Sequence, residues 1–144
     1  MGWLSNFSRF IVTYEGLAYP TSEHLYQALK FTDSASRERI RLTPKPMEAA
    51  RLGRTLPGMR ADWDSVKLAV MEEVLWLKLD QNPYLKEKLL ATGEAEIIED
   101  ATWDSWWGCG ADGKGRNELG KLWQKIRTEL CLREKEVGRK VKGN

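Results

Sequence analysis

The segment from Asp62 to Asn82 constrains the fold of this chain more than any other stretch of its sequence. When its residues are placed about 100° apart around a helix, the apolar ones gather on a single wide arc. That arc contains Trp63, Val66, Val70, Val74 and Leu77, and it is widened by Leu68, Met71, Leu75 and Leu79. Pro83 cannot continue the helix and marks its end. Because so wide an apolar arc must be covered, the segment is predicted to be a central helix that is buried on most sides.

The rest of the chain predicts several shorter helices and one small β element. Apolar residues at 11–14 and 17–19 flank a Glu-Gly pair, which is typical of a short hairpin. Thr21 or Ser22 can cap a helix that runs to about Phe31. The other predicted elements are helices near 36–42, 46–53, 83–91 and 117–133, a short strand over 96–99 and a loop over 100–116. These elements favour a mainly α, compact, multihelical single domain with a small N-terminal β-hairpin.

A chain of 144 residues is long enough for one ordinary domain with its own hydrophobic core. We expect this domain to occupy residues 1–133 and to be followed by a basic, flexible tail at 134–144, where dense charge replaces the apolar pattern. Every stretch without a charged side chain is far shorter than the roughly 20 apolar residues that a membrane span requires. The sequence therefore predicts a cytoplasmic protein without a membrane anchor.

The content of cysteine and histidine excludes several kinds of chemistry. The chain has two cysteines, Cys109 and Cys131, and one histidine, His24. A four-ligand zinc site of the usual Cys/His kind cannot be built from three such residues. A Ser-His-Asp triad would have to use His24, and nothing else in the sequence supports one. These residues therefore exclude that kind of zinc site, and no cofactor is predicted.

Basic residues are concentrated between Arg37 and Arg60, where seven basic side chains accompany two acidic ones. Such a run is most often a solvated face of the protein. The alternative is a surface that meets the phosphate groups of a ligand or a nucleic acid. The sequence leaves both interpretations open.

The segment from Trp103 to Asn117 has the most unusual composition, with three tryptophans, four glycines and two aspartates in 15 residues. Tryptophans beside glycines offer flat surfaces on which a nucleobase could stack; the alternative is that they cover the core. Residues 108–113 also spell the pattern GxGxxG. Neither a strand running directly into this pattern nor a βαβ unit around it is predicted, so a Rossmann fold is rejected.

Three side chains stand out as candidates for chemistry. Lys67 falls inside the apolar arc of the helix at 62–82, where a lysine either extends to the rim or is buried for a purpose, whereas Lys78 on the same helix suits the rim. Glu23 lies in the first turn of its helix, where a carboxylate stabilises the helix or could face a sugar carbon. Asp104, among the tryptophans, is the second candidate carboxylate. His24 suits a hydrogen-bonding residue better than a base.

These segments, in this order, resemble the YbiA-like family, also called NADAR, from about Trp3 to Leu130. The N-terminal half carries Leu4-Ser-Asn-Phe7, Tyr19-Pro-Thr-Ser-Glu-His-Leu-Tyr-Gln-Ala-Leu-Lys30, Ala50-Arg-Leu-Gly-Arg54 and Arg60-Ala-Asp-Trp-Asp-Ser-Val-Lys67 with Met71. The rest of the chain carries Lys78-Leu-Asp-Gln-Asn82, Leu89-Leu-Ala-Thr-Gly93, Ile98-Glu99, Asp104-Ser-Trp-Trp-Gly-Cys-Gly110, and Asp112-Gly-Lys-Gly-Arg-Asn-Glu-Leu-Gly-Lys-Leu122 with Ile126-Arg127.

The resemblance implies a compact helical fold and an N-glycosidase that needs no metal. Its expected substrates have a bond between ribose and a base-like amine, either in phosphorylated ribosylamino-pyrimidines of riboflavin biosynthesis or in ADP-ribosylated guanine of DNA. The catalytic residues that it implies are Glu23 at the reacting carbon, Lys67 as a Schiff-base nucleophile or a clamp on the leaving group, and Asp104 at the ribose hydroxyls. The substrate-binding residues that it implies are Asn6, Phe7, His24, Lys30, Trp103, Trp107, Gly108 and Asn117. The alternative is a non-catalytic module that binds NAD or ADP-ribose derivatives.

Overall fold

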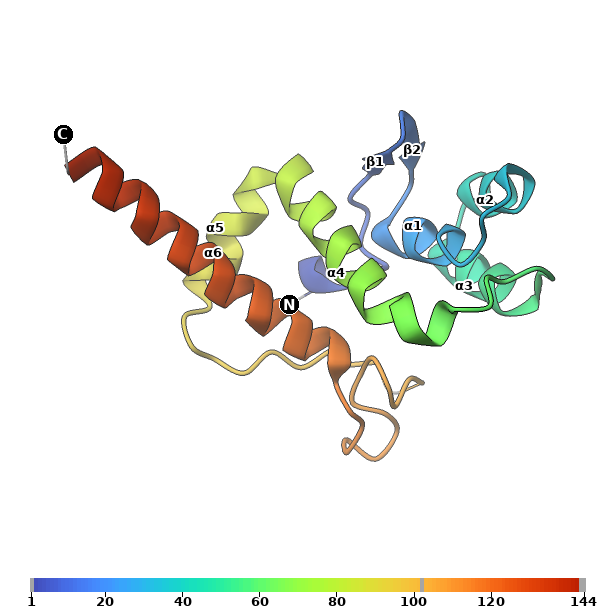
Figure 1. Ribbon diagram of the computed structural model, residues 1–144. Helices are drawn as coiled ribbons and strands as arrows, with labels where there is room; N and C mark the ends of the chain where they lie inside the picture. The colour runs from blue at the N-terminus through green and yellow to red at the C-terminus, as the bar shows by residue number, and fades with distance from the viewer. Residues whose placement is uncertain (1, 102, 143–144) are drawn as a thin grey trace. The chain divides into compact units, whose positions relative to one another are not determined.

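In a computed structural model that describes residues 2–101 and 103–142, the chain is mainly α-helical with one two-stranded hairpin (Figure 1). The helices are α1 (Ser22–Ala28), α2 (Ser34–Arg41), α3 (Pro46–Thr55), α4 (Trp63–Gln81), α5 (Pro83–Ala91) and α6 (Glu118–Lys142), after a 3₁₀ turn at Gly2–Leu4. The strands are β1 (Val12–Tyr14) and β2 (Leu17–Tyr19). The predicted fold class is confirmed. Contacts along the chain separate two units, Met1–Asn82 and Pro83–Asn144, which are described in turn.

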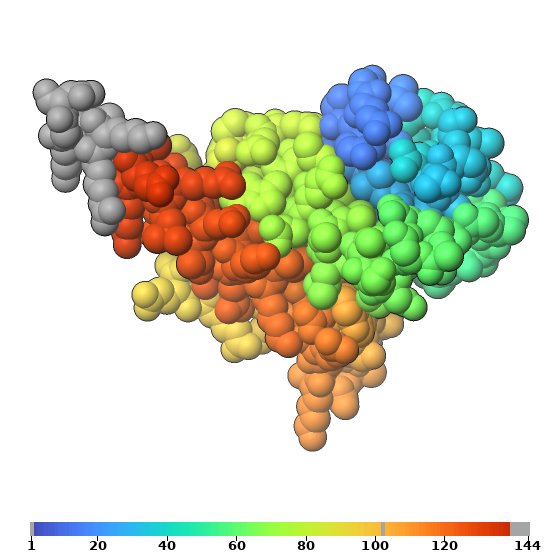
Figure 2. Space-filling view, viewed as in Figure 1, coloured from blue at the N-terminus to red at the C-terminus, as the bar shows by residue number. Residues whose placement is uncertain are grey.

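The hairpin of the first unit forms as predicted. Its strands are antiparallel, with Val12 opposite Tyr19 and Tyr14 opposite Leu17. Both turn residues have positive φ angles, 51° at Glu15 and 79° at Gly16, which is the backbone shape that a tight hairpin turn requires. In the space-filling view of Figure 2 the hairpin (blue) lies beside α2 (cyan), where Arg41 Nη1 donates to the Ala18 carbonyl oxygen at 3.3 Å.

Helix α1 is the most completely buried element of the first unit. All seven of its residues are buried, and it packs against α2, α3 and α4. Thr21 caps it by accepting a hydrogen bond from the backbone N–H of His24 at 3.2 Å. Helix α4 is less buried than predicted, because Leu68 is 42% exposed and Val66 and Val70 are half-buried. The short α1, surrounded on three sides, takes the central place that the sequence assigns to α4.

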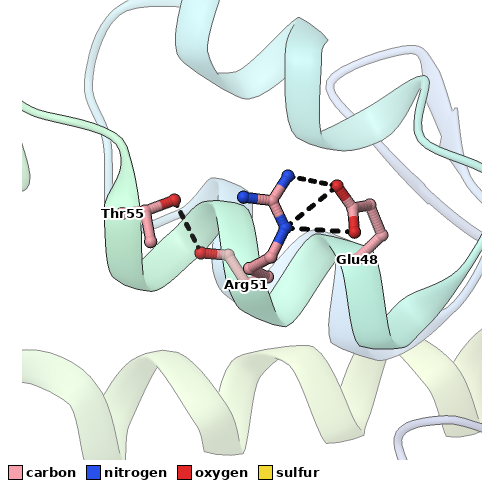
Figure 3. A network of polar contacts seen from close by, with 3 residues as sticks. All are labelled: Glu48, Arg51 and Thr55. Atoms are coloured by element: carbon pink, nitrogen blue, oxygen red, sulfur yellow. Dashed lines mark hydrogen bonds and ion pairs between the residues drawn. The ribbon is translucent and has the colours of Figure 1, made fainter.

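Helices α2 and α3 begin and end close to their predicted limits. Asp33 caps α2 by accepting from the Ser36 N–H at 2.8 Å, and hydrogen bonds from Ser36 lower the pKa of Asp33. Helix α3 begins at Pro46 as predicted and extends two residues past Gly53, to Thr55. Figure 3 shows its outer side, where the Arg51 guanidinium binds the Glu48 carboxylate and the Thr55 hydroxyl donates to the Arg51 carbonyl oxygen at 2.9 Å.

The second unit contains α5, α6 and the segment that joins them. Its core is formed by apolar side chains of both helices and of the joining segment: Leu85, Leu89, Ile97, Ala101, Leu119, Leu122, Trp123, Ile126 and Leu130. Helix α5 has the predicted limits, whereas α6 continues to Lys142 rather than ending near Arg133. Flexibility of the tail at 134–144 stays a prediction. No helix in the described part of the chain is long and apolar enough to cross a bilayer.

The strand predicted over Glu96–Glu99 is wrong: the described residues include no strand there. The segment is held instead by side chains of α6 and of the residue before it. The Ile97 N–H donates to Gln124 Oε1 at 2.9 Å, and the Glu99 N–H donates to Asn117 Oδ1 at 2.8 Å. Asn117 Nδ2 donates back to the Ile97 carbonyl oxygen at 2.8 Å. Side chains therefore satisfy the backbone groups that a neighbouring strand would otherwise pair.

Candidate active site

Glu23 is held by its backbone and by its carboxylate in the first unit. Its N–H donates to the Asn6 carbonyl oxygen at 3.0 Å, which fixes the start of α1 against the N-terminal segment. Its carboxylate Oε1 accepts from Gln27 Nε2 at 2.7 Å, one helical turn further along α1. Glu23 is only 8% exposed. A buried, oriented carboxylate of this kind can stabilise positive charge or direct a water molecule.

Asn6 joins three parts of the first unit. Its Oδ1 accepts from the Ser22 hydroxyl at 3.0 Å, and its Nδ2 donates to Met71 Sδ at 3.2 Å. The N-terminal segment is thereby tied to α1 on one side and to α4 on the other. The predicted role of Asn6 in binding substrate stays a prediction, and the structure adds a positioning role because its carbonyl oxygen receives the Glu23 N–H.

Lys67 lies on the face of α4 that packs against α1. One turn before it, the Trp63 ring lies 5.2 Å from the Tyr26 ring of α1, and one turn after it Met71 contacts Asn6. The side chain is 23% exposed, and its ammonium lies 3.7 Å from the Asp64 carboxylate. Glu23 and Lys67 thus belong to the same unit, and Asp64, one helical turn before Lys67, is the carboxylate that faces its ammonium.

Lys30 lies two residues after the end of α1 and close to the start of α4. Its Nζ lies 5.9 Å from the centre of the Tyr26 ring and 5.9 Å from that of Trp63. A cation in this position is attracted by the faces of both rings. Lys30 therefore provides a second amine near the start of α4, and its contact with substrate stays a prediction.

The prediction that Lys78 reaches the rim is wrong. Lys78 is 0% exposed. Its ammonium donates to the carbonyl oxygens of Trp3 at 2.7 Å and Ser5 at 3.0 Å and to the Ser8 hydroxyl at 3.1 Å, and it lies 5.2 Å from the centre of the Phe10 ring. Several acceptors around one ammonium offset the loss of hydration. Lys78 therefore holds the N-terminal segment that carries Asn6 and Phe7.

His24 has a structural environment. It is fully buried, and burial lowers the pKa of its ring, with a partly opposing contribution from the Thr43 carbonyl group. Its Nε2 donates to the Thr43 carbonyl oxygen at 2.8 Å, and its Nδ1 lies 2.8 Å from the Thr21 hydroxyl, from which it accepts. Its Nε2 thus joins α1 to the segment before α3, and its Nδ1 binds the residue that caps α1. Contact of His24 with substrate stays a prediction.

Phe7 lines an open cavity of about 760 Å³ in the first unit. The other lining residues are Arg9, Ile11, Ala18, Tyr19, Pro20, Thr21, Pro44, Lys45 and Pro46. The lining contains two cations and no carboxylate, and neither Glu23 nor Lys67 contributes to it. This cavity is therefore separate from the side chains predicted to carry the reaction.

Asp104, in the second unit, uses one carboxylate oxygen within its own turn. Its Oδ1 accepts from the N–H groups of Trp106 at 2.9 Å and Trp107 at 2.8 Å. Such a side-chain turn competes with other uses of the same oxygen. The role of Asp104 at ribose hydroxyls stays a prediction that requires its other oxygen.

The tryptophans differ in exposure. Trp103 is 70% exposed, whereas Trp106 and Trp107 are half-buried and meet edge to face at 4.5 Å. The Arg116 guanidinium lies 5.1 Å from the centre of the Trp106 ring. The exposed Trp103 ring fits the interpretation as a stacking surface. The half-buried pair Trp106 and Trp107 fits the interpretation as a cover of the core. Both interpretations therefore stay open for this loop.

Gly108 and Asn117 have structural roles in the second unit. A Cβ at Gly108 would lie 2.7 Å from Ala101 Cβ and 2.8 Å from the Ala101 carbonyl oxygen, so only glycine lets the two parts of the loop approach. Asn117 has a φ angle of 51° and bridges Ile97 and Glu99 with its amide. Direct contact of either residue with substrate stays a prediction.

The sequence predicts no functional role for Gln27 and only the end of a helix for Gly53. Gln27 binds Glu23, and Gly53 contacts the Gln27 side chain. The spacing of four residues between Glu23 and Gln27 was the available signal, since side chains at that spacing meet on a helix.

The chain is similar to several known proteins. The family model described as NADAR domain matches residues 1–131. N-glycosidase YbiA of Escherichia coli (strain K12) is 42% identical over 132 residues, which cover 91% of this chain and 82% of that protein. N-glycosidase Npun_R5314 of Nostoc punctiforme is 39% identical over 133 residues, which cover 90% of this chain and 85% of that protein.

Two further matches concern a longer protein and a solved structure. Riboflavin biosynthesis protein VVA0006 of Vibrio vulnificus is 40% identical over 130 residues, which cover 90% of this chain and 35% of that protein. The NMR structure of E. coli YbiA matches with a TM-score of 0.84 and 42% identity, covering 94% of this chain and 81% of that one. The family model spans nearly the whole chain, and relatives named N-glycosidases match it over most of their own length, so this chain belongs to the NADAR domain family and is an N-glycosyl hydrolase.

Proposed function

We propose that the protein cleaves the bond between ribose and a base-like amine in phosphorylated ribosylamino-pyrimidines. The single observation that carries this proposal is the buried Glu23 carboxylate, oriented by Gln27 on the helix that packs against the Lys67 face of α4. Cleavage of such a bond develops positive charge on the sugar carbon, and an oriented carboxylate stabilises that charge or directs water to it. The name of the relative VVA0006, a riboflavin biosynthesis protein, supports this substrate class.

Lys67 is proposed to act as the nucleophile. The ribose would first open, the bond from the sugar carbon to the ring oxygen breaking and that oxygen taking up a proton. After its ammonium loses a proton, the Lys67 amine would add to the sugar carbon. The bond from that carbon to the base-like amine would then break, the amine would leave with a proton from Nζ, and an imine would remain between Nζ and the carbon. Water would then hydrolyse the imine, releasing the sugar phosphate and regenerating the amine. The competing role is a cationic clamp on the leaving group, with Glu23 and water carrying the reaction alone.

The residues of the second unit keep the roles that the family resemblance implies. Asp104 is proposed to bind ribose hydroxyls through the carboxylate oxygen that its turn does not use. Trp107 is proposed to stack on the heterocycle, and Trp103 to add a second aromatic surface. These assignments explain why a loop rich in tryptophan and glycine accompanies the catalytic residues in one chain.

The small-molecule substrate is favoured over ADP-ribosylated DNA by the ion pairs of the basic stretch. Four of its seven cations face carboxylates: Arg37 with Glu15, Arg41 with Glu38, Arg51 with Glu48, and Arg60 with Asp62. The Arg37 Nε also donates to the Phe31 carbonyl oxygen at 2.7 Å. Cations that already have protein partners release fewer counterions when they meet phosphates. These ion pairs favour the interpretation of residues 37–60 as a solvated surface whose charges are paired within the protein, rather than as a surface that binds DNA phosphates.

Product analysis tests the proposal. The protein is incubated with a phosphorylated ribosylamino-pyrimidine and, in parallel, with an oligonucleotide that carries ADP-ribosylated guanine. We expect free pyrimidine amine and ribose phosphate from the first substrate. If only the oligonucleotide releases ADP-ribose, the substrate is ADP-ribosylated DNA. If neither substrate gives a product, the alternative of a non-catalytic binding module is favoured.

Borohydride trapping tests the role of Lys67. Reduction during turnover would convert the imine into a stable amine, and peptide mass mapping would locate the added mass on Lys67. Lys67→Arg keeps the charge but cannot form the imine, so it is expected to be nearly inactive. Lys30→Arg is the matched control, because Lys30 is the other amine near α4. An adduct on Lys30, or an active Lys67→Arg protein without an adduct, would overturn the assignment.

Salt dependence tests the DNA alternative. A protein that neutralises several DNA phosphates shows a steep fall of log affinity with log salt. We expect a shallow slope for the small substrate and a slope near zero for the modified oligonucleotide. A steep slope would contradict the interpretation of the basic stretch as internally paired.

A further inference from the structure

We infer that Gln27 is a positioning residue for the Glu23 carboxylate and that Gly53 is the surface that keeps the Gln27 amide in place. The inference rests on the proposed function, in which Glu23 acts at the sugar carbon. It assigns roles to one residue of the Glu-His helix motif and to one residue of the Ala50–Arg54 motif.

The first observation is the hydrogen bond between the two side chains of α1. Gln27 Nε2 donates to Glu23 Oε1 at 2.7 Å. Gln27 is 6% exposed and Glu23 is 8% exposed, so little water competes for this bond. An amide donor to an ionised carboxylate is stronger than a bond between neutral groups, and its geometry fixes the direction of the acceptor.

The second observation concerns the carbonyl oxygen of the Gln27 amide, Oε1. Among the described residues, the buried Gln27 Oε1 has no hydrogen-bond partner. Rotating the amide by half a turn would place this oxygen against the Glu23 carboxylate, which only accepts when ionised. The orientation that donates to Glu23 is therefore kept although it leaves a carbonyl oxygen unsatisfied. This is the pattern of a side chain whose position serves its neighbour.

The third observation is the close approach of α3. A Cβ built at Gly53 would collide with Gln27 Oε1, would lie 2.8 Å from Gln27 Cδ and would lie 3.2 Å from Gln27 Cβ. Gly53 is inside a helix and has no positive φ angle, so the backbone conformation does not require glycine. Glycine is required here because it has no side chain. Any side chain at this position would push the amide away from Glu23.

Together these contacts connect α3 to the Glu23 carboxylate through the Gln27 side chain. Gly53 leaves space for the Gln27 amide, and the amide presents its N–H to Glu23. The arrangement favours Glu23 as an ionised acceptor that stabilises charge or receives a proton from water, because the N–H of Gln27 repels a proton on the same oxygen. Because Oε1 accepts this N–H, a proton carried by Glu23 would sit on Oε2.

The decisive variant is Gln27→Met, which has similar length and no donor. We expect kcat to fall about 10- to 100-fold with KM changed less than about twofold, as for an interaction used mainly in the transition state. The Glu23 resonance, followed by NMR in protein with ¹³C-labelled glutamate and assigned by its loss in Glu23→Gln, should titrate about one pH unit higher than in the wild type.

The matched control is Gln81→Met on α4. The Gln81 amide makes two hydrogen bonds, accepting from the Thr13 N–H at 2.7 Å and donating to the Thr13 carbonyl oxygen at 2.8 Å. It has no contact with Glu23 among the described residues. The control should move neither the Glu23 titration nor kcat. An unchanged Glu23 titration in Gln27→Met would overturn the inference even if that variant were less stable.

The other charges on the elements packed against α1 are constant in this comparison. They are Lys30 just after α1; Asp64, Lys67, Glu72, Glu73, Lys78 and Asp80 on α4; Glu48, Arg51 and Arg54 on α3; Arg37, Glu38, Arg39 and Arg41 on α2; and Glu15 in the hairpin. Because none of them changes, a shift between Gln27→Met and wild type reports the missing donor. The neighbouring His24 is also unchanged.

A double-mutant cycle tests Gly53. Gly53→Ala is expected to lower kcat about as much as Gln27→Met, because the added methyl displaces the amide. In a Gln27→Ala background the methyl enters vacated space, so the same substitution should have little further effect on kcat. Equal effects of Gly53→Ala in both backgrounds would show that it does not act through Gln27.

The outcomes separate this inference from the proposed function. If Glu23→Gln retains turnover, the proposed role of Glu23 is wrong, whatever the NMR titration shows. If Glu23→Gln is inactive and Gln27→Met leaves kcat and the Glu23 titration unchanged, only the positioning role fails. The NMR measurement needs no substrate, so it remains decisive even if the natural substrate differs.

Discussion

The two units hold their predicted functional residues in different ways. In the first unit Glu23 is bound by another side chain of α1 and by the backbone of the N-terminal segment, which buried Lys78 fixes. In the second unit Asp104 and Asn117 are bound mainly to backbone groups of their own loop and its neighbours. The first arrangement orients a carboxylate through packed helices, whereas the second shapes a loop.

Because of this difference, substitutions of the two kinds of residue should have different effects, one on activity and the other on stability. A side chain held by another side chain can be changed while the backbone stays in place, so its loss should affect chemistry first. A side chain that satisfies backbone N–H and carbonyl groups supports the loop itself, so its loss should affect folding first. The predictions below test that contrast, beginning with the largest effect.

Glu23→Gln is expected to lower turnover about 10²- to 10⁴-fold with little loss of stability. The substituted amide retains an oxygen that can accept from Gln27 but carries no charge. Turnover is measured together with thermal unfolding, and Glu48→Gln on the outer side of α3 is the control. Near-normal turnover, or failure of the variant to fold, would make Glu23 a stabiliser of α1 and remove the contrast between the units.

Lys78→Met is expected to lower the free energy of unfolding by about 2–4 kcal/mol, because it leaves buried acceptors without their donor. Those acceptors are the carbonyl oxygens of Trp3 and Ser5 and the Ser8 hydroxyl. Denaturant unfolding measures the change. The exposed Lys45→Met should stay within about 0.5 kcal/mol of wild type. Equal stability of the two variants would contradict the role of Lys78 in fixing the N-terminal segment.

Asp104→Ala is expected to lower the free energy of unfolding by about 1–2 kcal/mol, since it removes the acceptor for two backbone N–H groups. Asp104→Asn keeps a carbonyl oxygen for that turn and should fold nearly as well as wild type. If the charge also binds ribose hydroxyls, the asparagine variant should raise KM despite its stability. A normal KM would leave Asp104 with its structural role alone.

His24 is expected to give the smallest effect, a dependence of stability on pH. Burial lowers its pKa in the folded state, so the unfolded chain binds more protons between that pKa and the ordinary value of about 6.5. Its contribution to stability is therefore complete above about pH 6.5 and is lost as the pH falls through this window. His24→Gln can keep both hydrogen bonds and does not titrate.

The measurement compares the free energy of unfolding of the two proteins between about pH 7 and pH 5. The difference between them should shift in favour of the glutamine variant as the solution becomes acidic, since only the wild type must bury a group that gains a proton. Parallel curves would show that the environment of His24 does not oppose protonation. The comparison also removes the common contribution of carboxylates such as Asp33 and Glu38, whose pKa values are lowered.

Local sequence signals predicted most of the fold because each acts within a few residues. The Glu15-Gly16 turn, the Thr21 cap, Pro46 and Pro83 predicted the starts and ends of elements that the structure contains. The prediction of a strand over 96–99 failed because the segment has no neighbouring strand among the described residues, and side chains of Asn117 and Gln124 take the place of one. Nothing within the segment itself indicates those partners.

The candidate site was predictable as a set of residue types and less so as a set of contacts. Glu23 was singled out by its place in the first turn of its helix, Lys67 by its charge within an apolar arc, and both by family resemblance; both lie in the first unit. Lys78 was assigned to the rim, because its angular position gives no information about the carbonyl groups that surround it. Gln27 and Gly53 gained a role only when α3 was seen against α1.

Capping residues, prolines and periodicity act locally and the motifs are ordered along the chain, so the helical fold class, the hairpin and the family were predictable from residue order. Tertiary contacts, in contrast, determine which helix of the first unit is central, which lysine is buried and what orients the Glu23 carboxylate. Those properties depend on contacts between segments such as Gln27 and Gly53, or Lys78 and Trp3, that lie far apart in sequence. Periodicity describes which face of a helix is apolar, and packing alone decides what lies against that face.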